Sequence, residues 1–177
     1  MPARKGQPRH LAPVQDAQRA LSLIRAKAKE SGIEPQRIGI LGFSAGGNVA
    51  AIAATNSDQR QYEATDETDK VSCRPDFAVL IYPAWLVDGK SPGLVPEVRV
   101  SPQTPPTFFA HAGDDKIVAE SSIQMHLALR QAKVPTELHV FADGGHGFGM
   151  RPSAHAIASW PRLCEGWLRT MKFIPSP

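Results

Sequence analysis

The chain has 177 residues, of which 42% are hydrophobic and 21% are charged. This length and balance fit one globular domain that buries a sizeable core. The formal net charge of +3 comes from scattered Lys and Arg, with one local concentration at the start of the chain (RKGQPRH). We therefore interpret the basic start as a solvated tail and expect no nucleic-acid partner.

The cysteine content and the hydropathy indicate the redox state of the thiols and the compartment of the protein. Cys73 and Cys164 are the only cysteines, and their separation indicates neither a disulfide framework nor a metal motif. We expect two free thiols. The sequence shows no signal-peptide core and no apolar run that could cross a bilayer. As written it predicts a cytoplasmic protein with no membrane partner, or a secreted one if the N-terminus is incomplete.

The first predicted element is an amphipathic helix that follows a flexible N-terminal arm over residues 1–12. It occupies residues 13–32, and Gly32 would end it. The apolar residues at helical spacing, which we expect to face the core, are Ala17, Leu21, Ile24 and Ala28.

Beyond this helix, short apolar runs alternate with helical patterns. The predicted strands cover residues 37–43, 76–82, 107–111 and 136–141. The predicted helices cover residues 44–55 and 119–133, and a last helix begins near Ser159 or Trp160. The polar residues 56–75 and the Pro-rich residues 83–106 are predicted loops. This alternation predicts one α/β domain over residues 13–177, a three-layer α/β/α sandwich around a mostly parallel sheet.

The sequence GFSAG, residues 42–46, lies directly after a predicted strand and directly before a predicted helix. A G-x-S-x-G motif in that position is typical of a turn that exposes a serine hydroxyl, here that of Ser44. Glycines on both sides would avoid clashes of a Cβ with the tight turn. The backbone N–H of Ala45, at the positive end of the helix, would stabilise an oxyanion. The alternative is a glycine-rich turn that binds phosphate.

A serine nucleophile needs a base, and the base needs an acid that orients it. His146 follows the last strand in a glycine-rich loop, from which a side chain reaches the carboxyl ends of the strands. His10 and His155 are expected to be solvated or structural, and His111 is expected to pack in the core or to contact a residue of the active site. His126 lies within a predicted helix and His139 within a predicted strand.

The acid is expected in the loop after the third strand, which contains Asp114 and Asp115. We prefer Asp115 because it stands three residues before Val118, which we expect to anchor the loop. Asp114 would then cap or brace the loop, and Asp143 remains an outside alternative. The chain order serine, aspartate, histidine is the one expected for the α/β-hydrolase arrangement.

Three segments resemble the α/β-hydrolase superfamily, and within it the acetyl-esterase and acetylxylan-esterase-like group. They correspond to the turn that carries the nucleophile (the elbow, at Ser44), the loop that carries the acid (the acid loop, at Asp115) and the loop that carries the base (the histidine loop, at His146). They are IGILGFSAGGNVAA, PPTFFAHAGDDKIV and KVPTELHVFADGGHGFGM, and WPRLCEGWL resembles the final helix. The resemblance runs from about Pro13 to about Leu168. It implies a truncated α/β-hydrolase fold without a large cap domain. It also implies a serine carboxylesterase for short-chain, acetyl-type esters, with Ser44 as nucleophile, Asp115 as acid, His146 as base, and no metal or cofactor.

The sequence departs from that group before the elbow. Members usually carry several strands there and a Gly-rich loop that completes the oxyanion hole, whereas 43 residues precede Ser44 and contain no such loop. Loss of one oxyanion donor lowers kcat by about 10²–10³-fold. We therefore expect a slow enzyme, unless the side chain of Asn48 or the backbone of Gly46 or Gly47 substitutes. The preferred alternative is that these residues only shape the start of the helix.

The same departure places the elbow strand at a sheet edge. Because an apolar edge favours pairing, we expect two chains to meet edge to edge around a two-fold axis, as a homodimer or part of a larger homo-oligomer. The alternative is that the chain is a fragment of a longer enzyme.

Alternative interpretations exist for three residues of the Pro-rich segment and for the function of the protein. Trp85, Leu86 and Leu94 are expected either to line an acyl pocket or to cover the core. The rival functions are a prolyl-oligopeptidase-like peptidase and a catalytically weak hydrolase-like module that acts as a binding or scaffold protein.

Overall fold

Four parallel strands form the centre of the computed structural model, which describes residues 6–89 and 93–175. The strands are β1 (Gly39–Phe43), β2 (Phe77–Ile81), β3 (Thr107–Ala112) and β4 (Thr136–Phe141). They lie side by side in chain order, each parallel to the next. The predicted strands and the parallel sheet are thus confirmed. Because the strands are parallel, all their carboxyl ends lie at the same end of the sheet.

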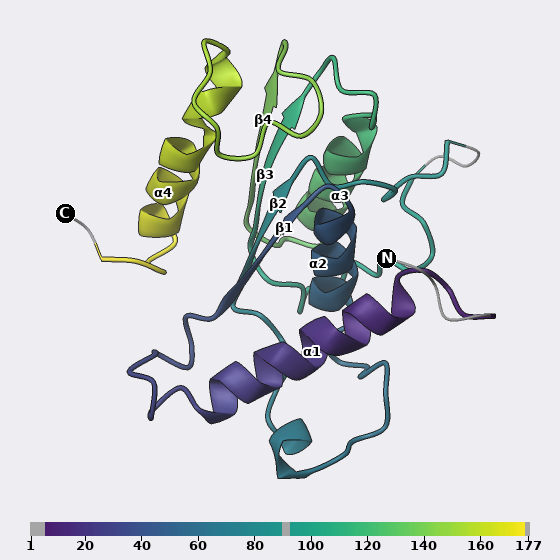
Figure 1. The fold of residues 1–177 in the computed structure, drawn as a ribbon, viewed down its shortest axis with the longest axis vertical. Helices are drawn as coiled ribbons and strands as arrows, with labels where there is room; N and C mark the ends of the chain where they lie inside the picture. Colours follow the sequence, from purple (N-terminus) through teal and green to yellow (C-terminus); the bar gives the residue numbers. More distant parts are fainter. Residues whose placement is uncertain (1–5, 90–92, 176–177) are drawn as a thin grey trace.

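Helices cover both faces of this sheet. Helix α2 (Ala45–Thr55) and helix α3 (Glu120–Gln131) lie on one face, and helix α4 (Trp160–Thr170) lies on the other (Figure 1). The first core cluster joins α2 and α3 to the sheet, and the second joins α4 to it through Trp160 and Trp167. Helix α1 (Leu11–Ala26) packs beside α2. The three-layer α/β/α arrangement is therefore the predicted one, whereas the division into an arm and a domain stays a prediction.

Helix α1 differs from its prediction in length and in its buried face. It ends at Ala26, and residues 27–32 form turns instead of continuing to Gly32. Ile24, expected in the core, is 43% exposed. The buried residues are Val14, Gln18, Leu21 and Ser22. Leu21 and Ala28 are buried as expected and Ala17 packs against the core, whereas apolar periodicity missed Gln18 and Ser22 because they are polar.

A loop explains the two buried polar side chains of α1. Gln18 accepts the backbone N–H of Gln61 and donates to the carbonyl of Asn56, while Ser22 donates to the carbonyl of Val71. Residues 56–71 therefore dock on α1 through hydrogen bonds, which makes polar residues the correct partners there.

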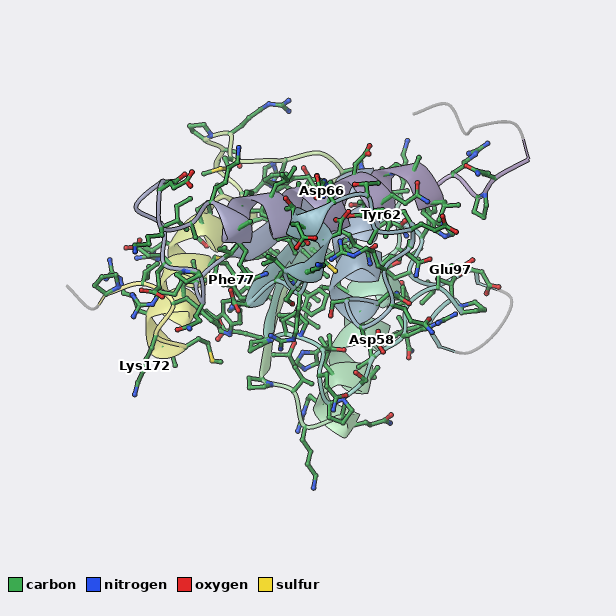
Figure 2. All side chains as sticks on the ribbon, turned by 90° about the horizontal axis from the view of Figure 1, so that it is seen from below. Asp58, Tyr62, Asp66, Phe77, Glu97 and Lys172 are labelled. Carbon is green, nitrogen blue, oxygen red and sulfur yellow. The ribbon has the colours of Figure 1, made fainter. Side chains whose placement is uncertain are left out.

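Charged groups extend this docking. Arg19 on α1 contacts Asp66 at 2.6 Å and Asp69 at 2.9 Å, and the short 3-10 helix η1 (Glu67–Lys70) carries the second of these carboxylates. Asp66 and Tyr62 lie beside α1 in Figure 2. The hydrogen bond from Arg19 lowers the pKa of Asp66 to about 2. A second 3-10 helix, η2 (Ala156–Ser159), precedes α4.

Strand β1 lies at one edge of the sheet, as expected, and β2 is its neighbour on the inner side. Leu41 in the middle of β1 is 51% exposed. Cys73 and Cys164 are both buried free thiols. Among the described residues, none of the helices combines the length and the apolar character needed to cross a membrane.

Candidate active site

The loops at the carboxyl ends of the strands bring together residues that are far apart in sequence. Ser44 directly follows β1, Asp115 lies three residues after β3, and His146 lies five residues after β4. In open parallel sheets this edge is where ligands bind, because the loops there converge from neighbouring strands.

Ser44 has a strained backbone of the kind that a nucleophile elbow requires. Its φ is +52° and its ψ is −119°, a conformation that costs a non-glycine residue roughly 1–3 kcal/mol. Three backbone hydrogen bonds hold it: the Ser44 N–H donates to the carbonyl of Ile81, and the Ser44 carbonyl accepts from the N–H groups of Asn48 and Ala84. The sharp turn sends the side chain out of the sheet at the start of α2.

The glycines that leave no room for a side chain are Gly42 and Gly47, whereas the predicted pair was Gly42 and Gly46. A Cβ on Gly42 would lie 2.2 Å from the carbonyl oxygen of Gly46, so the close approach of β1 and α2 excludes any side chain there. A Cβ on Gly46 would meet nothing within 4 Å, which contradicts the expected clash. The second excluded position is Gly47, where a Cβ would lie 2.8 Å from Cα of Pro83.

A continuous chain of hydrogen bonds links the three predicted side chains. Ser44 Oγ lies 2.8 Å from His146 Nε2, and His146 Nδ1 lies 2.8 Å from Oδ2 and 3.0 Å from Oδ1 of Asp115. The side chain of Asp115 is fully buried, whereas that of His146 is 34% exposed. A buried carboxylate on Nδ1 fixes the ring so that Nε2 faces the hydroxyl, which is the arrangement that base catalysis needs.

The loop of Asp115 is anchored by backbone groups, not by Val118. That residue is 50% exposed, so the reason given above for preferring Asp115 was wrong although the geometry favours this aspartate. The N–H of Ile117 donates to Asp115 Oδ1 at 2.8 Å, and the Ile117 carbonyl lies 2.8 Å from His111 Nε2. His111 is fully buried, and its burial lowers its pKa.

The two alternative acids occupy other positions. Asp114 accepts the backbone N–H of Gly145 at 2.8 Å and so braces the loop that carries His146, as its alternative role anticipated. Asp143 lies 3.1 Å from Nδ1 of the exposed His155. Neither of these contacts joins Asp114 or Asp143 to His146.

Sequence reasoning missed Tyr82, which directly follows β2. Its φ is +40°, its side chain is buried, and its ring packs edge-on against His146 with the ring centres 5.0 Å apart. Phe148 packs against the same tyrosine at 4.4 Å. Burial raises the pKa of Tyr82. The available signal was its position, since it leaves the sheet between the strands that carry Ser44 and Asp115.

An open groove runs between α1, β1 and α2 and reaches the start of α2, although Ser44, Asp115 and His146 do not line it. Its volume is about 820 Å³, and Ala45, Gly46 and Trp85 line its end at the elbow. Trp85 is 59% exposed and has a φ of +56°. Leu86 is fully buried in the first core cluster, and Leu94 packs against that cluster. Leu86 therefore does not line the expected acyl pocket and has the alternative role, which was to cover the core.

Asn48 fixes the orientation of the segment that carries Trp85. Its amide Nδ2 donates to the carbonyl of Ala84 at 3.1 Å and contacts that of Trp85 at 3.4 Å. These bonds occupy the amide hydrogens, so Asn48 positions the loop and does not offer the side-chain oxyanion donor that we considered. The N–H of Ala45 is in the first turn of α2, where helical N–H groups have no intrahelical acceptor.

The described part of the chain contains no group of three His, Cys, Asp or Glu side chains that could hold a metal ion. What the site offers is a hydroxyl, an imidazole, a carboxylate and a helix N-terminus. Together these groups are able to transfer an acyl group through a covalent intermediate.

Comparison with known protein families divides the chain into two overlapping parts. The dienelactone hydrolase family matches residues 78–176, more than half of the chain, and the BD-FAE family matches residues 5–85. The first match contains the predicted acid and base, and the second contains the elbow.

Individual relatives are similar over most of this chain but are longer. An acetylxylan esterase of Xylanibacter ruminicola is 30% identical over 93% of this chain and 36% of the relative. Endo-1,4-beta-xylanase B of Butyrivibrio fibrisolvens is 31% identical over 79% of this chain and 25% of the relative. The chain thus spans only about a third and a quarter of their lengths.

Solved structures agree with the fold. The acetyl ester-xyloside bifunctional hydrolase of Caldicellulosiruptor lactoaceticus superposes with a TM-score of 0.81 at 36% identity, covering 93% of this chain and 67% of that one. The α/β-hydrolase fold expected from the motifs is therefore confirmed.

Proposed function

Since this chain belongs to the dienelactone hydrolase family, we propose that it is a serine carboxylesterase that hydrolyses short-chain, acetyl-type esters through an acyl-enzyme intermediate. The observation that carries the proposal is the hydrogen-bonded chain from Ser44 through His146 to Asp115, with the serine held in a strained turn. The named esterases among the similar proteins support the same reaction class.

The geometry supports a defined sequence of steps. Ser44 Oγ attacks the ester carbonyl carbon while its proton passes to His146 Nε2, and the oxygen that gains negative charge faces the N–H of Ala45. The C–O bond to the alcohol then breaks, and the alcohol leaves with the proton from His146. Water next gives a proton to Nε2 and attacks the acyl carbon, which releases the acid and restores Ser44. Asp115 stabilises the imidazolium in both halves.

The groove beside the elbow supports a carbohydrate as the alcohol part of the ester. An exposed aromatic ring at the end of an open groove offers a flat face to a sugar ring, and Trp85 is in that position. The lining of the groove is mostly apolar, and Arg9, Asp16 and Glu97 add charged groups that could bind hydroxyl groups. The acetylxylan esterase among the relatives supports an acetylated xylo-oligosaccharide as the substrate.

Two measurements test the reaction. Wild-type protein and Ser44→Ala are incubated with p-nitrophenyl acetate, and we expect hydrolysis above background only in the wild type. A fluorophosphonate probe should label Ser44 at neutral pH, with the adduct mapped by mass spectrometry. Equal background rates in both proteins, together with no labelling, would favour the scaffold function. Faster cleavage of a peptide than of the ester would favour the peptidase.

A third measurement tests the sugar. Trp85→Ala should raise KM for an acetylated xylo-oligosaccharide by about tenfold, as expected for the loss of one aromatic contact. The KM for p-nitrophenyl acetate, which has no sugar, should stay unchanged. An equal rise for both substrates would show that Trp85 supports the elbow and not the carbohydrate.

We also propose that the outer edge of β1 pairs with the same edge of a second copy around a two-fold axis. The half-exposed Leu41 and the backbone groups of an edge strand support this pairing. Sedimentation at micromolar concentration should give a dimer, and Leu41→Lys should give a monomer. A wild-type monomer under those conditions would contradict the proposal.

A further inference from the structure

His111 is a buried histidine behind the proposed active site that the reaction steps do not use. It belongs to β3, and its side chain is completely inaccessible to solvent. Its Nε2 lies 3.5 Å from Oδ2 of Asp115, the carboxylate oxygen that His146 contacts at 2.8 Å. The two imidazoles therefore approach one carboxylate from different sides.

Both nitrogens of His111 have partners on other segments. Nδ1 lies 2.8 Å from Oγ of Ser122 in the first turn of α3, and Nε2 lies 2.8 Å from the carbonyl of Ile117 in the acid loop. The ring therefore joins the end of β3, the loop that carries Asp115 and the start of α3. A side chain that only filled space would not need a directional contact with each of these segments.

The partners also determine the tautomer of His111. The carbonyl of Ile117 only accepts hydrogen bonds, so Nε2 must carry the proton. Nδ1 then accepts from the hydroxyl of Ser122. The burial of the ring, which lowers the pKa of His111, favours this neutral form at neutral pH. The Nε2–H consequently donates to the Ile117 carbonyl, and Oδ2 of Asp115 lies 3.5 Å from the same nitrogen.

We propose that His111 is a positioning residue for Asp115: its Nε2–H holds the acid loop in the shape that aims the carboxylate at His146 Nδ1. This inference rests on the proposed function, because it assigns His111 a part in the same reaction. His111 does not touch the substrate and acts only through Asp115. The N–H of Ile117 completes the arrangement, since it donates to the other oxygen of the same carboxylate.

Two matched substitutions separate positioning from packing. The amide of glutamine reaches the place of Nε2, so His111→Gln keeps a donor toward Ile117 and Asp115. The amide of asparagine reaches only the place of Nδ1, so His111→Asn keeps the contact with Ser122 and loses that donor. Both replacements are neutral and polar, and both remove the aromatic ring.

We expect His111→Gln to retain most of the wild-type kcat for p-nitrophenyl acetate and His111→Asn to lose up to about 10²-fold, the scale of a misplaced catalytic group. KM should change little in either variant, because substrate does not reach the buried ring. Thermal unfolding is measured for both proteins. Equal losses of kcat in the two variants, at equal stability, would overturn the proposal.

Two spectroscopic measurements complete the test, the first on the unaltered protein and the second on the two variants. Proton–nitrogen correlation spectra of ¹⁵N-histidine-labelled protein should show His111 neutral with its proton on Nε2, and a ring protonated on Nδ1 would overturn the proposal. A low-field proton signal from His146 Nδ1–H should persist in His111→Gln and weaken in His111→Asn.

The two hypotheses fail in different ways. If the wild type neither hydrolyses the ester nor reacts with the fluorophosphonate, the proposed function fails. The tautomer of His111 and the His146 signal still test the positioning of Asp115 in that case.

Discussion

The elbow at Ser44 and the loops of Asp115 and His146 meet at one site but are held by different forces. Ser44 is positioned by its backbone, through a strained φ and three main-chain hydrogen bonds at the start of α2. Asp115 and His146 are positioned by side chains, which donate to or accept from the loops around them. Strand β1 lies at the edge of the sheet, whereas β3 is buried along its whole length.

This difference determines which substitutions each part tolerates. In the elbow, the space next to the backbone matters, so adding one methyl group at Gly42 or Gly47 is harmful. In the acid and histidine loops, the loss of a single donor or acceptor releases the loop.

The largest effect is expected from the residue that connects the two parts. His146→Ala removes the base from Ser44 and the partner of Asp115, and kcat for p-nitrophenyl acetate should fall by about 10⁴-fold or more. The folded protein should persist, because the His146 side chain is partly exposed. Rates measured beside Ser44→Ala should be equally low, and the double variant should be no worse than either single one.

The role of glycine in the elbow is best tested by measuring the free energy of unfolding. Gly42→Ala places a Cβ 2.2 Å from the Gly46 carbonyl oxygen, a backbone atom that cannot rotate away. We expect a loss of about 3 kcal/mol in the free energy of unfolding and a Tm lower by about 10 °C.

Gly46→Ala is the matched control for that substitution, because its Cβ would meet nothing within 4 Å and alanine favours helix. Its stability should stay the same or rise by about 0.5 kcal/mol. If both variants lose equally, the backbone contact between β1 and α2 is not what selects glycine in the elbow.

The acid loop, unlike the elbow, should respond to mild acid. Burial lowers the pKa of His111, while the contacts with the Ile117 carbonyl and Asp115 oppose that shift, and a positive charge on His146 would add to it. The unfolded chain therefore binds a proton more readily than the folded one, and stability is lost as pH falls below about 6.5, the ordinary pKa of histidine. Above that pH the contribution is constant.

His111→Gln serves as the control for this pH dependence. It removes the titrating ring, so its free energy of unfolding, measured by urea denaturation between neutral pH and pH 5, should fall less steeply than that of the wild type. Glu120 also faces this region and stays in place in both proteins. Identical slopes would show that His111 does not titrate in this range.

The sequence predicted the elements and the three residues of the hydrogen-bonded chain because both depend on local patterns. Apolar runs between glycines and prolines placed the four strands, and parallel strands necessarily bring the loops after them to one edge. Ser44, Asp115 and His146 all stand in such loops. Their places could thus be predicted without knowing any side-chain contact.

The remaining features depend on contacts between distant segments, which no local pattern contains. The buried face of α1 includes Gln18 because a loop more than forty residues away presents backbone groups to it. Gly47 excludes a side chain because Pro83 passes behind it. Hydrogen bonds of the Ile117 backbone with Asp115 and His111 hold the acid loop, and the apolar Val118 is half-exposed.

The smallest effect is expected at the rim of the histidine loop, where two aspartates form a natural pair for comparison. Asp114→Ala removes the acceptor of the Gly145 N–H, and we expect a loss of about 1 kcal/mol in stability with a several-fold lower kcat, because the loop next to His146 loosens. Asp143→Ala removes only a contact with the exposed His155, so both quantities should stay at wild-type values. Because the two residues are similarly exposed and close to His146, a general loss of negative charge would affect both alike. A larger loss in Asp143→Ala would mean that the histidine loop is held from its β4 end and not by the acid loop.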